Sequence, residues 1–157
     1  MNTRKIIIII STFFYLGYLP AIPGTFASIA GIILFYLIKA SNFLYLFFTL
    51  SLVCLGFLVS GKAEEYFKKK DPKYIVIDEV AGMFLSLIWL PYYTTQVIII
   101  AFVLFRILDI LKPYPAGRFQ ELKGSLGIMS DDLAAALYTN IILQIVTRII
   151  LGSRFFR

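Results

Sequence analysis

The stretch NFLYLFFTLSLVCLGFLVS, residues 42–60, contains no charged side chain. A helix needs about 20 apolar residues to cross the hydrocarbon core of a bilayer, and this stretch approaches that length. The chain of 157 residues is 60% hydrophobic, and its mean hydropathy is +0.87, well above the usage of soluble proteins. These observations predict an all-α fold, a polytopic membrane helical bundle with short cytoplasmic loops, in which residues 1–157 form a single domain. The alternative is a very apolar soluble bundle.

The other apolar runs predict helices on both sides of this stretch. We expect helices over residues 25–38, 42–60 with an extension into water over 63–70, 78–90, 97–111 and 131–151. The run 6–18 is too short to span a bilayer comfortably. It resembles the core of a signal peptide, but the Pro- and Gly-rich residues after it favour an interfacial or re-entrant segment.

The distribution of basic residues predicts the orientation of the bundle. Lys and Arg gather in the loops 61–73 and 112–130 and at the N-terminus, and the positive-inside rule places these regions in the cytoplasm. The net charge of +6 fits a protein that faces anionic lipid headgroups, and basic residues confined to loops between apolar spans argue against nucleic acid. An odd number of spans would place Arg154 and Arg157 outside, so either the last helix or the first apolar run does not cross fully.

Three charged residues lie at intervals of three near the end of an apolar run. Arg106, Asp109 and Lys112 share one face of a helix that we expect to end before Pro113. Ionisable groups beside membrane-depth segments are costly and by default mark a functional site. The alternative is an internal ion pair between Arg106 and Asp109 that holds two helices together.

Five of the nine acids fall in three short motifs at predicted helix ends on the cytoplasmic side. They are Asp78, Glu79, Asp109, Asp131 and Asp132. Carboxylates brought together repel unless a cation neutralises them. The chain has no histidine, and its one cysteine, Cys54, lies in an apolar run where we expect it to be buried, so oxygen ligands and Mg²⁺ are favoured over Zn²⁺. N-capping by Asp78 and Asp131 is the alternative, but it does not explain the doubled acids.

The turn at residues 23–25 predicts an anion site. Thr25 is expected to be the N-cap of a helix with Ser28 three residues on, and free N–H groups at a helix start can hold a phosphate. Together with Arg106, Lys112 and the acids, this turn predicts phosphoryl chemistry at the membrane surface. Cysteine- and histidine-dependent phosphatases are excluded by the residues available. Attack by metal-activated water is the first choice, and attack by one of the five acids stays open.

Four motifs, in this order, resemble those of the phosphatidylglycerophosphatase A family. They read Pro23-Gly24-Thr25-x-x-Ser28, Asp78-Glu79-x-x-Gly82-Met83, Phe105-Arg106-x-x-Asp109-x-x-Lys112-Pro113-x-Pro115 and Gly127-Ile128-Met129-x-Asp131-Asp132-x-x-Ala135. Ala63-Glu64 followed by Asp71 also fits the family pattern. Ala136 departs from it, since the family usually shows Gly there.

The resemblance implies a Mg²⁺-dependent enzyme of the bacterial inner membrane whose active site faces the cytoplasm. Such an enzyme hydrolyses phosphatidylglycerophosphate to phosphatidylglycerol and inorganic phosphate. Carried over, the five acids become metal ligands and catalytic acids, and the phosphate contacts become Thr25, Ser28, Arg106 and Lys112. Lys62 and Arg118 are suggested as headgroup contacts from their charge alone, and Gly82 as a point of close helix approach.

Two non-enzymatic alternatives remain at this level. The first is a cation-handling membrane protein whose acids line a transport path, although acids confined to helix ends on one side argue against it. The second is a structural subunit whose charges pair helices.

Overall fold

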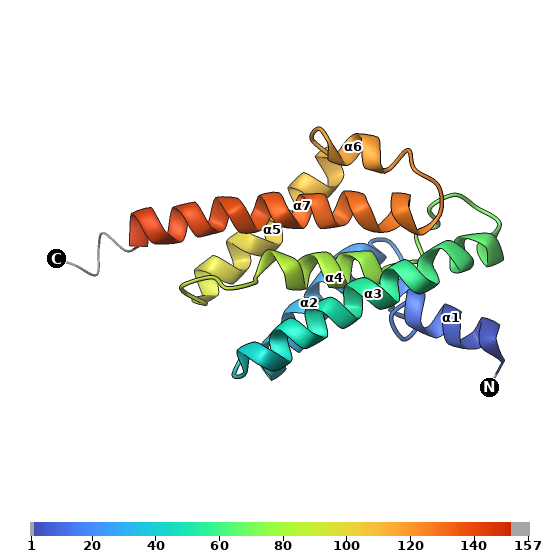
Figure 1. Ribbon diagram of the computed structural model, residues 1–157, viewed down its shortest axis with the longest axis horizontal. Coiled ribbons are helices and arrows are strands. Elements are labelled where there is room, and N and C mark those ends of the chain that lie inside the picture. Colours follow the sequence, from blue (N-terminus) through green and yellow to red (C-terminus); the bar gives the residue numbers. More distant parts are fainter. Residues whose placement is uncertain (1, 152–157) are drawn as a thin grey trace.

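The computed structural model describes residues 2–151, and within them it contains helices and no strand (Figure 1). The helices are α1 (Thr3–Ser11), η1 (Leu16–Tyr18), α2 (Pro23–Ile38), α3 (Asn42–Phe67), α4 (Ile77–Ser86), α5 (Thr95–Leu111), α6 (Ala116–Phe119), α7 (Ser125–Val146) and the π-helical turn η2 (Thr147–Leu151). The predicted all-α class is confirmed. Arg154 and Arg157, on which the span count depended, lie outside the described residues.

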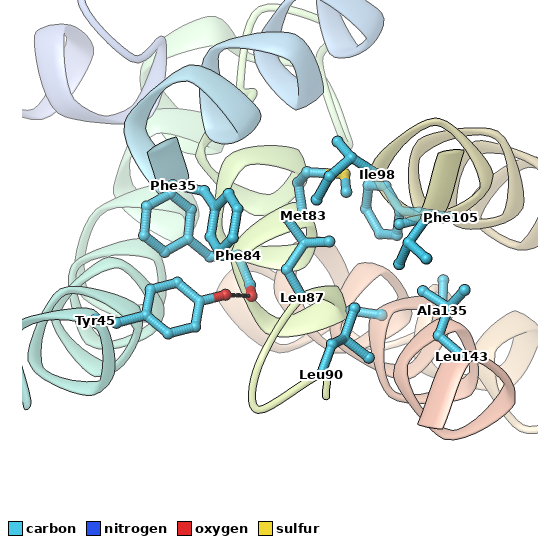
Figure 2. Close-up of a cluster of buried hydrophobic side chains, with 13 residues drawn as sticks. Phe35, Tyr45, Met83, Phe84, Leu87, Leu90, Ile98, Phe105, Ala135 and Leu143 are labelled. Carbon is cyan, nitrogen blue, oxygen red and sulfur yellow. Dashed lines mark hydrogen bonds between the residues drawn. The ribbon is translucent and has the colours of Figure 1, made fainter. Parts of the chain in front are cut away.

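The short helix α4 is the centre of the bundle. It contacts α2, α3, α5 and α7, and nearly all of its side chains are buried. Figure 2 shows the largest part of the core, in which Met83 and Phe84 of α4 lie among Phe35 of α2, Phe105 of α5 and Leu143 of α7. Residues from the first and last thirds of the chain therefore meet around α4.

Two helices are long and apolar enough to cross a membrane, by length and composition. They are α3 and the continuous helical stretch Ser125–Ile149, while the apolar helix α2 is shorter. The ten residues of α4 extend only about 15 Å, half the thickness of a hydrocarbon core. The polytopic part of the prediction is therefore not confirmed. Cys54 is exposed rather than buried, because it lies on the face of α3 that points away from the bundle.

The predicted helix 78–90 was too long, because α4 ends at Ser86. A turn follows, in which Trp89 has a φ of 51°. Side-chain amides of α7 donate to the carbonyl groups that this ending frees: Asn140 Nδ2 to Ser86 O (3.1 Å) and Ile88 O (2.8 Å), and Gln144 Nε2 to Trp89 O (2.9 Å). Polar partners on a neighbouring helix thus allow α4 to end inside an apolar bundle.

The predicted start of the last helix at Asp131 was wrong by almost two turns. Gly124, with a φ of 63°, precedes the first residue Ser125, whose Oγ accepts a hydrogen bond from the Gly61 N–H (3.0 Å). Asp131 is therefore no N-cap. Asp78 is no N-cap either, because it follows the N-cap residue Val76 by two positions. The other boundaries agree more closely, since α5 spans Thr95–Leu111 and α3 continues past residue 60 to Phe67 as expected.

The N-terminal segment forms a short helix and an irregular turn. After the nine residues of α1, Phe13, Phe14 and Tyr15 all adopt positive φ angles. Val76 N–H donates to Ser11 O (2.9 Å), which ties this segment to the residues before α4. Helix α1 is too short to span a bilayer, and an interfacial position for residues 6–18 stays a prediction.

Candidate active site

Three carboxylates meet where the first turn of α4 contacts α7. Asp78 and Glu79 of α4 and Asp132 of α7 each place one oxygen within 4.8 Å of the others. We call these three residues the acid group. Asp78 and Asp132 are 6% and 4% exposed, and Asp78 Oδ1, Glu79 Oε2 and Asp132 Oδ2 are buried without a hydrogen-bond partner. Buried charges without partners are costly, so this geometry fits a hard cation held by oxygen ligands.

The last turn of α5 brings Asp109 and Arg106 next to the acid group. Arg106 Nη1 lies 2.9 Å from Asp109 Oδ2, an ion pair within one helix rather than between two helices. The geometry still leaves the buried Nη1 without a hydrogen bond. Arg106 therefore retains donor capacity that could bind an anion.

Burial and mutual repulsion set the electrostatics of α4. Burial raises the pKa of Asp78 well above its usual range, and the charges of Glu79 and Asp132 add to this shift. Burial also raises the pKa of Glu79; the hydrogen bond with Asp78 and the charge of Arg106 oppose the shift, while the charge of Asp109 increases it. Both carboxyl groups thus hold their protons more strongly than exposed acids do.

The start of α2 closes one side of the site, and Gly24 makes this approach possible. A methyl group at Gly24 would lie 2.2 Å from Glu79 Oε1 and 3.2 Å from Arg106 Nη1. Thr25 is not the predicted N-cap, because α2 begins at Pro23 and its N-cap is Ile22. The buried Ser28 Oγ donates to Gly24 O at 3.0 Å, so its hydrogen is used inside the helix. The backbone at Gly24 is therefore nearest to the acids.

Asp131 and Lys112 form a separate pair. Lys112 ends α5 with a φ of 45°, and its Nζ donates to Asp131 Oδ2. Burial lowers the pKa of Lys112, but the hydrogen bond and charge of Asp131, together with the charges of Asp132 and Asp109, outweigh it and the pKa is raised. The structure thus brings Asp78, Glu79 and Asp132 together, with Asp109 and Arg106 beside them, whereas Asp131 holds Lys112.

The remaining suggested residues lie in different surroundings. Lys62 is exposed on α3, and the Arg118 guanidinium lies 5.4 Å from the centre of the Tyr114 ring. A Cβ at Gly82 would lie 2.6 Å from Phe105, which confirms that this glycine permits close helix approach. Ala136 is fully buried in the core.

One acid outside the predicted site residues acts electrostatically on the acid group. The negative charge of Asp71, between α3 and α4, contributes to the raised pKa of Asp78. The sequence offered a weak signal, since Glu64 and Asp71 fit the family pattern, but the surrounding lysines made them resemble ordinary surface charges.

Comparison with known proteins identifies the family to which the chain belongs. A profile of the phosphatidylglycerophosphatase A family matches residues 9–147. The phosphatidylglycerophosphatase A of Haemophilus influenzae is 37% identical over 80% of this chain and 79% of its own length, and that of Escherichia coli is 34% identical over 83% and 77%. A putative phosphatidylinositol-3-phosphatase of Bacteroides thetaiotaomicron is 34% identical over 91% of this chain and 94% of its own length. No solved structure matches the chain.

The matched region contains every residue of the acid group, Asp109 and both cations, and all three relatives are named as phosphatases. The chain is therefore an enzyme, a phosphoric monoester hydrolase. It belongs to the phosphatidylglycerophosphatase A family, as its motifs predicted. The two non-enzymatic hypotheses are thereby set aside.

Proposed function

We propose that this enzyme hydrolyses phosphatidylglycerophosphate to phosphatidylglycerol and inorganic phosphate and that it requires Mg²⁺. The observation that carries the proposal is the acid group, whose three buried carboxylate oxygens have no hydrogen-bond partner and lie beside a cation with an unused donor. Two of the named phosphatidylglycerophosphatases resemble the chain over four fifths of its length. A headgroup monoester carries the negative charge that Arg106 can bind.

The acid group suits Mg²⁺ because its donors are all hard oxygen atoms. Asp78, Glu79 and Asp132 would hold the ion, with Asp109 next to them. When bound, Mg²⁺ would offset the charge of the acids and polarise the phosphoryl oxygens. Asp131 then remains outside the ligand set and keeps Lys112 oriented.

The other residues of the site bind and orient the phosphate in this proposal. Arg106 donates to its oxygens from α5, Lys112 contributes a second positive charge, and the start of α2 at Gly24 offers backbone N–H groups. Thr25 lies in the same turn and Ser28 supports it from one turn further on. Hydrolysis then proceeds by direct attack of water, with attack by a carboxylate as the alternative.

The membrane location follows from the apolar helices and the bacterial relatives. Helix α3 and the stretch Ser125–Ile149 are long and apolar enough to cross a bilayer, and exposed lysines at residues 68–70 lie in the connection that leads from α3 to the acids of α4. The positive-inside rule then supports an active site at the cytoplasmic face of the inner membrane. Residues from α2 to α7 contribute to one site, which supports a single domain over residues 1–157.

The test is release of inorganic phosphate from phosphatidylglycerophosphate by the purified protein in detergent, with Mg²⁺ and with excess EDTA. We expect turnover with Mg²⁺ and its loss in EDTA. Full activity in EDTA would refute the metal requirement, and no turnover under either condition would refute the proposed activity.

A second substrate is supported by one relative. The alignment with the putative phosphatidylinositol-3-phosphatase covers 91% of this chain and 94% of that relative. Phosphatidylinositol 3-phosphate should therefore be tested in the same assay, and kcat/KM for the two lipids compared. A larger value for the inositol lipid would replace the proposed substrate while leaving the site unchanged.

A further inference from the structure

An open apolar groove lies between the end of α5 and the middle of α7. Its volume is about 300 Å³, and we call it the α5–α7 groove. The Tyr138 hydroxyl donates to Tyr114 O (3.1 Å), which holds the segment after α5 against α7. The residues that line the groove are Leu108, Pro113, Tyr114, Tyr138, Ile141 and Ile142. Apolar and aromatic side chains from two helices thus form one continuous surface.

The α5–α7 groove starts at the edge of the candidate active site. Pro113 follows Lys112, whose Nζ donates to Asp131 Oδ2. Tyr138 and Ile142 follow Asp131 by seven and eleven positions, about two and three turns, so all three lie on one face of α7. At 1.5 Å per residue they are about 10 Å and 16 Å further along the helix. The groove therefore continues the face of α7 that holds the pair of Lys112 and Asp131.

Along α7 the groove leads away from the basic end of the molecule. The Gly61 N–H donates to Ser125 Oγ (3.0 Å), so α7 starts beside the part of α3 that leads to the exposed lysines at residues 68–70. Figure 1 shows α7 running from there to the opposite end of the bundle. Residues 133–147 carry no charged side chain. In a bilayer the groove would therefore face hydrocarbon, while the acid group lies nearer the headgroups.

The substrate proposed above has its parts in the same order. Its terminal phosphate is separated from the acyl chains by a glycerol, a bridging phosphate and a second glycerol. A groove in direct contact with the acid group would be too close to the phosphate for an acyl chain. The α5–α7 groove leaves space for the spacer, because Tyr138 and Ile142 lie two to three turns beyond Asp131. Lys112 lies between the two regions, where the bridging phosphate would pass.

We propose that the α5–α7 groove binds one acyl chain of the lipid substrate while the terminal phosphate is bound beside the acid group. This inference rests on the proposed lipid phosphatase activity. The chain exchanges one apolar environment for another, so the groove adds little to the affinity for the lipid. Its contribution is to fix the position of the headgroup relative to the acids.

A second apolar groove offers an internal control. It has a volume of about 290 Å³ and lies between α2 and α3, with Leu34, Leu55 and Phe84 among its lining residues. None of its described lining residues is next to a residue of the candidate active site in the sequence. Bulk lipid would enter both grooves, whereas the substrate chain enters the α5–α7 groove alone.

The experiment fills each groove in turn. Ile141→Trp adds bulk to the α5–α7 groove and Leu55→Trp to the second groove, at side chains that are 54% and 38% exposed and thus outside the core. The full-length proteins are assayed on phosphatidylglycerophosphate in mixed micelles and on its deacylated, water-soluble headgroup. Thermal unfolding with and without Mg²⁺ checks that each variant keeps its fold and its acid group.

The expected losses depend on both the groove and the substrate. Ile141→Trp should lower kcat/KM for the lipid about 10- to 100-fold, because a displaced chain moves the phosphate by about 1 Å. Its kcat/KM for the deacylated headgroup and its Mg²⁺-induced Tm shift should match those of wild type. Leu55→Trp should match wild type on both substrates. Wild type itself should use the deacylated headgroup at least about tenfold less efficiently, since a truncated substrate loses the binding energy that orients the reacting group.

A photoreactive substrate locates the chain directly. Phosphatidylglycerophosphate with a diazirine halfway along one acyl chain is irradiated with the Asp132→Asn variant, in which turnover should be slow, and mass spectrometry identifies the labelled peptides. We expect label at residues 108–114 and 138–142. Unlabelled phosphatidylglycerophosphate should compete with this labelling, whereas phosphatidylcholine with the same chains should not.

Three results with an active wild type would overturn the inference alone. They are unchanged lipid turnover in Ile141→Trp, an equal loss of that variant on the deacylated headgroup, and equal labelling of both grooves with competition by phosphatidylcholine. The last result would mean that bulk lipid occupies the α5–α7 groove. A wild type that hydrolyses no lipid monoester overturns the proposed function and this inference with it.

Discussion

The two ends of α4 are both buried against α7, yet the polar groups at one end have hydrogen-bond partners and those at the other end lack them. At the C-terminal end, Asn140 and Gln144 donate to the free carbonyl groups, and the Tyr45 hydroxyl donates to Phe84 O (Figure 2). At the N-terminal end, Asp78, Glu79 and Asp132 keep oxygens without partners. Satisfied polar groups stabilise a fold, while unsatisfied ones mark where a ligand belongs.

One face of α7 serves both ends. Asp132, Asn140 and Gln144 follow each other at multiples of four residues, so they lie along the same side of the helix. Two turns of helix separate an acid directed at the site from an amide that caps a helix end. The same neighbour therefore contributes a carboxylate to the acid group at one end of α4 and structural support at the other end, and substitutions can separate these two contributions.

The largest effect is expected at the unsatisfied end. Asp132→Asn keeps the shape of the side chain but removes its charge, and kcat should fall about 10³-fold because a metal-ion contribution is worth several kcal/mol. Stability should be retained, since one buried charge in the acid group is removed. Phosphate release and thermal unfolding measure the two quantities.

The neighbouring acid provides the control for this change. Asp131 pairs with Lys112 rather than with the acid group, so Asp131→Asn should cost only about tenfold, mainly in KM through a misplaced lysine. Equal losses in kcat for Asp131→Asn and Asp132→Asn would show that the two acids act together and that the pairing of Asp131 with Lys112 does not set it apart.

The sequence predicted more of the chemistry than of the geometry. The all-α class and the acidic motifs could be predicted from hydropathy and motif spacing, because apolar runs and charged residues at fixed spacing are local signals. The end of α4 at Ser86 could not be predicted in this way, because its free carbonyl groups are satisfied by side-chain amides of α7, more than fifty residues later in the chain. The pairing of Asp131 with Lys112 also depends on tertiary contact. Neighbouring acids, Asp131 and Asp132, resemble one motif but face different partners.

An intermediate effect is expected where α2 meets the acids. In Gly24→Ala the new methyl group would displace the Glu79 carboxylate, which lies 2.2 Å from its position. A displacement of about 1 Å can cost about 10²-fold in rate, so kcat should fall 10- to 100-fold in a folded protein.

Gly31→Ala on the same helix is the matched control. Its methyl group would lie 3.1 Å from Met83 Cβ, in the core rather than at the site. It should lower Tm slightly and leave kcat unchanged. Normal turnover in Gly24→Ala would show that the start of α2 does not confine the acids.

At the satisfied end the effect should fall on stability alone. Asn140→Leu leaves Ser86 O without its amide donor, while Ile88 O keeps the bond from Gln144 Nε2 (3.2 Å), and an unsatisfied buried group costs about 1–3 kcal/mol. Tm should fall, while kcat per folded molecule stays within about twofold of wild type. The conservative change Ile141→Leu on the exposed face controls for altered packing. A large loss of kcat without a change in Tm would contradict the expectation that the C-terminal end of α4 serves stability and only its N-terminal end serves activity.

The smallest effect is a pH dependence of stability that the unsatisfied end alone should cause. The pKa of Asp78 and of Glu79 is raised in the folded protein, so the folded state binds more protons than the unfolded state above the ordinary value of about 4. The free energy of unfolding without metal should therefore fall as pH rises from about 5 towards 8. If Mg²⁺ binds the acid group as proposed, it takes the place of these protons and should raise Tm and flatten the slope. Thermal unfolding across this pH range, in EDTA and in Mg²⁺, measures both pH dependences of Tm. In EDTA, Asp78→Asn should lose part of this pH dependence, whereas Asn140→Leu should keep all of it. A Tm in EDTA that rises with pH would contradict the electrostatics of the acid group, because only partnered carboxylates gain stability in that direction.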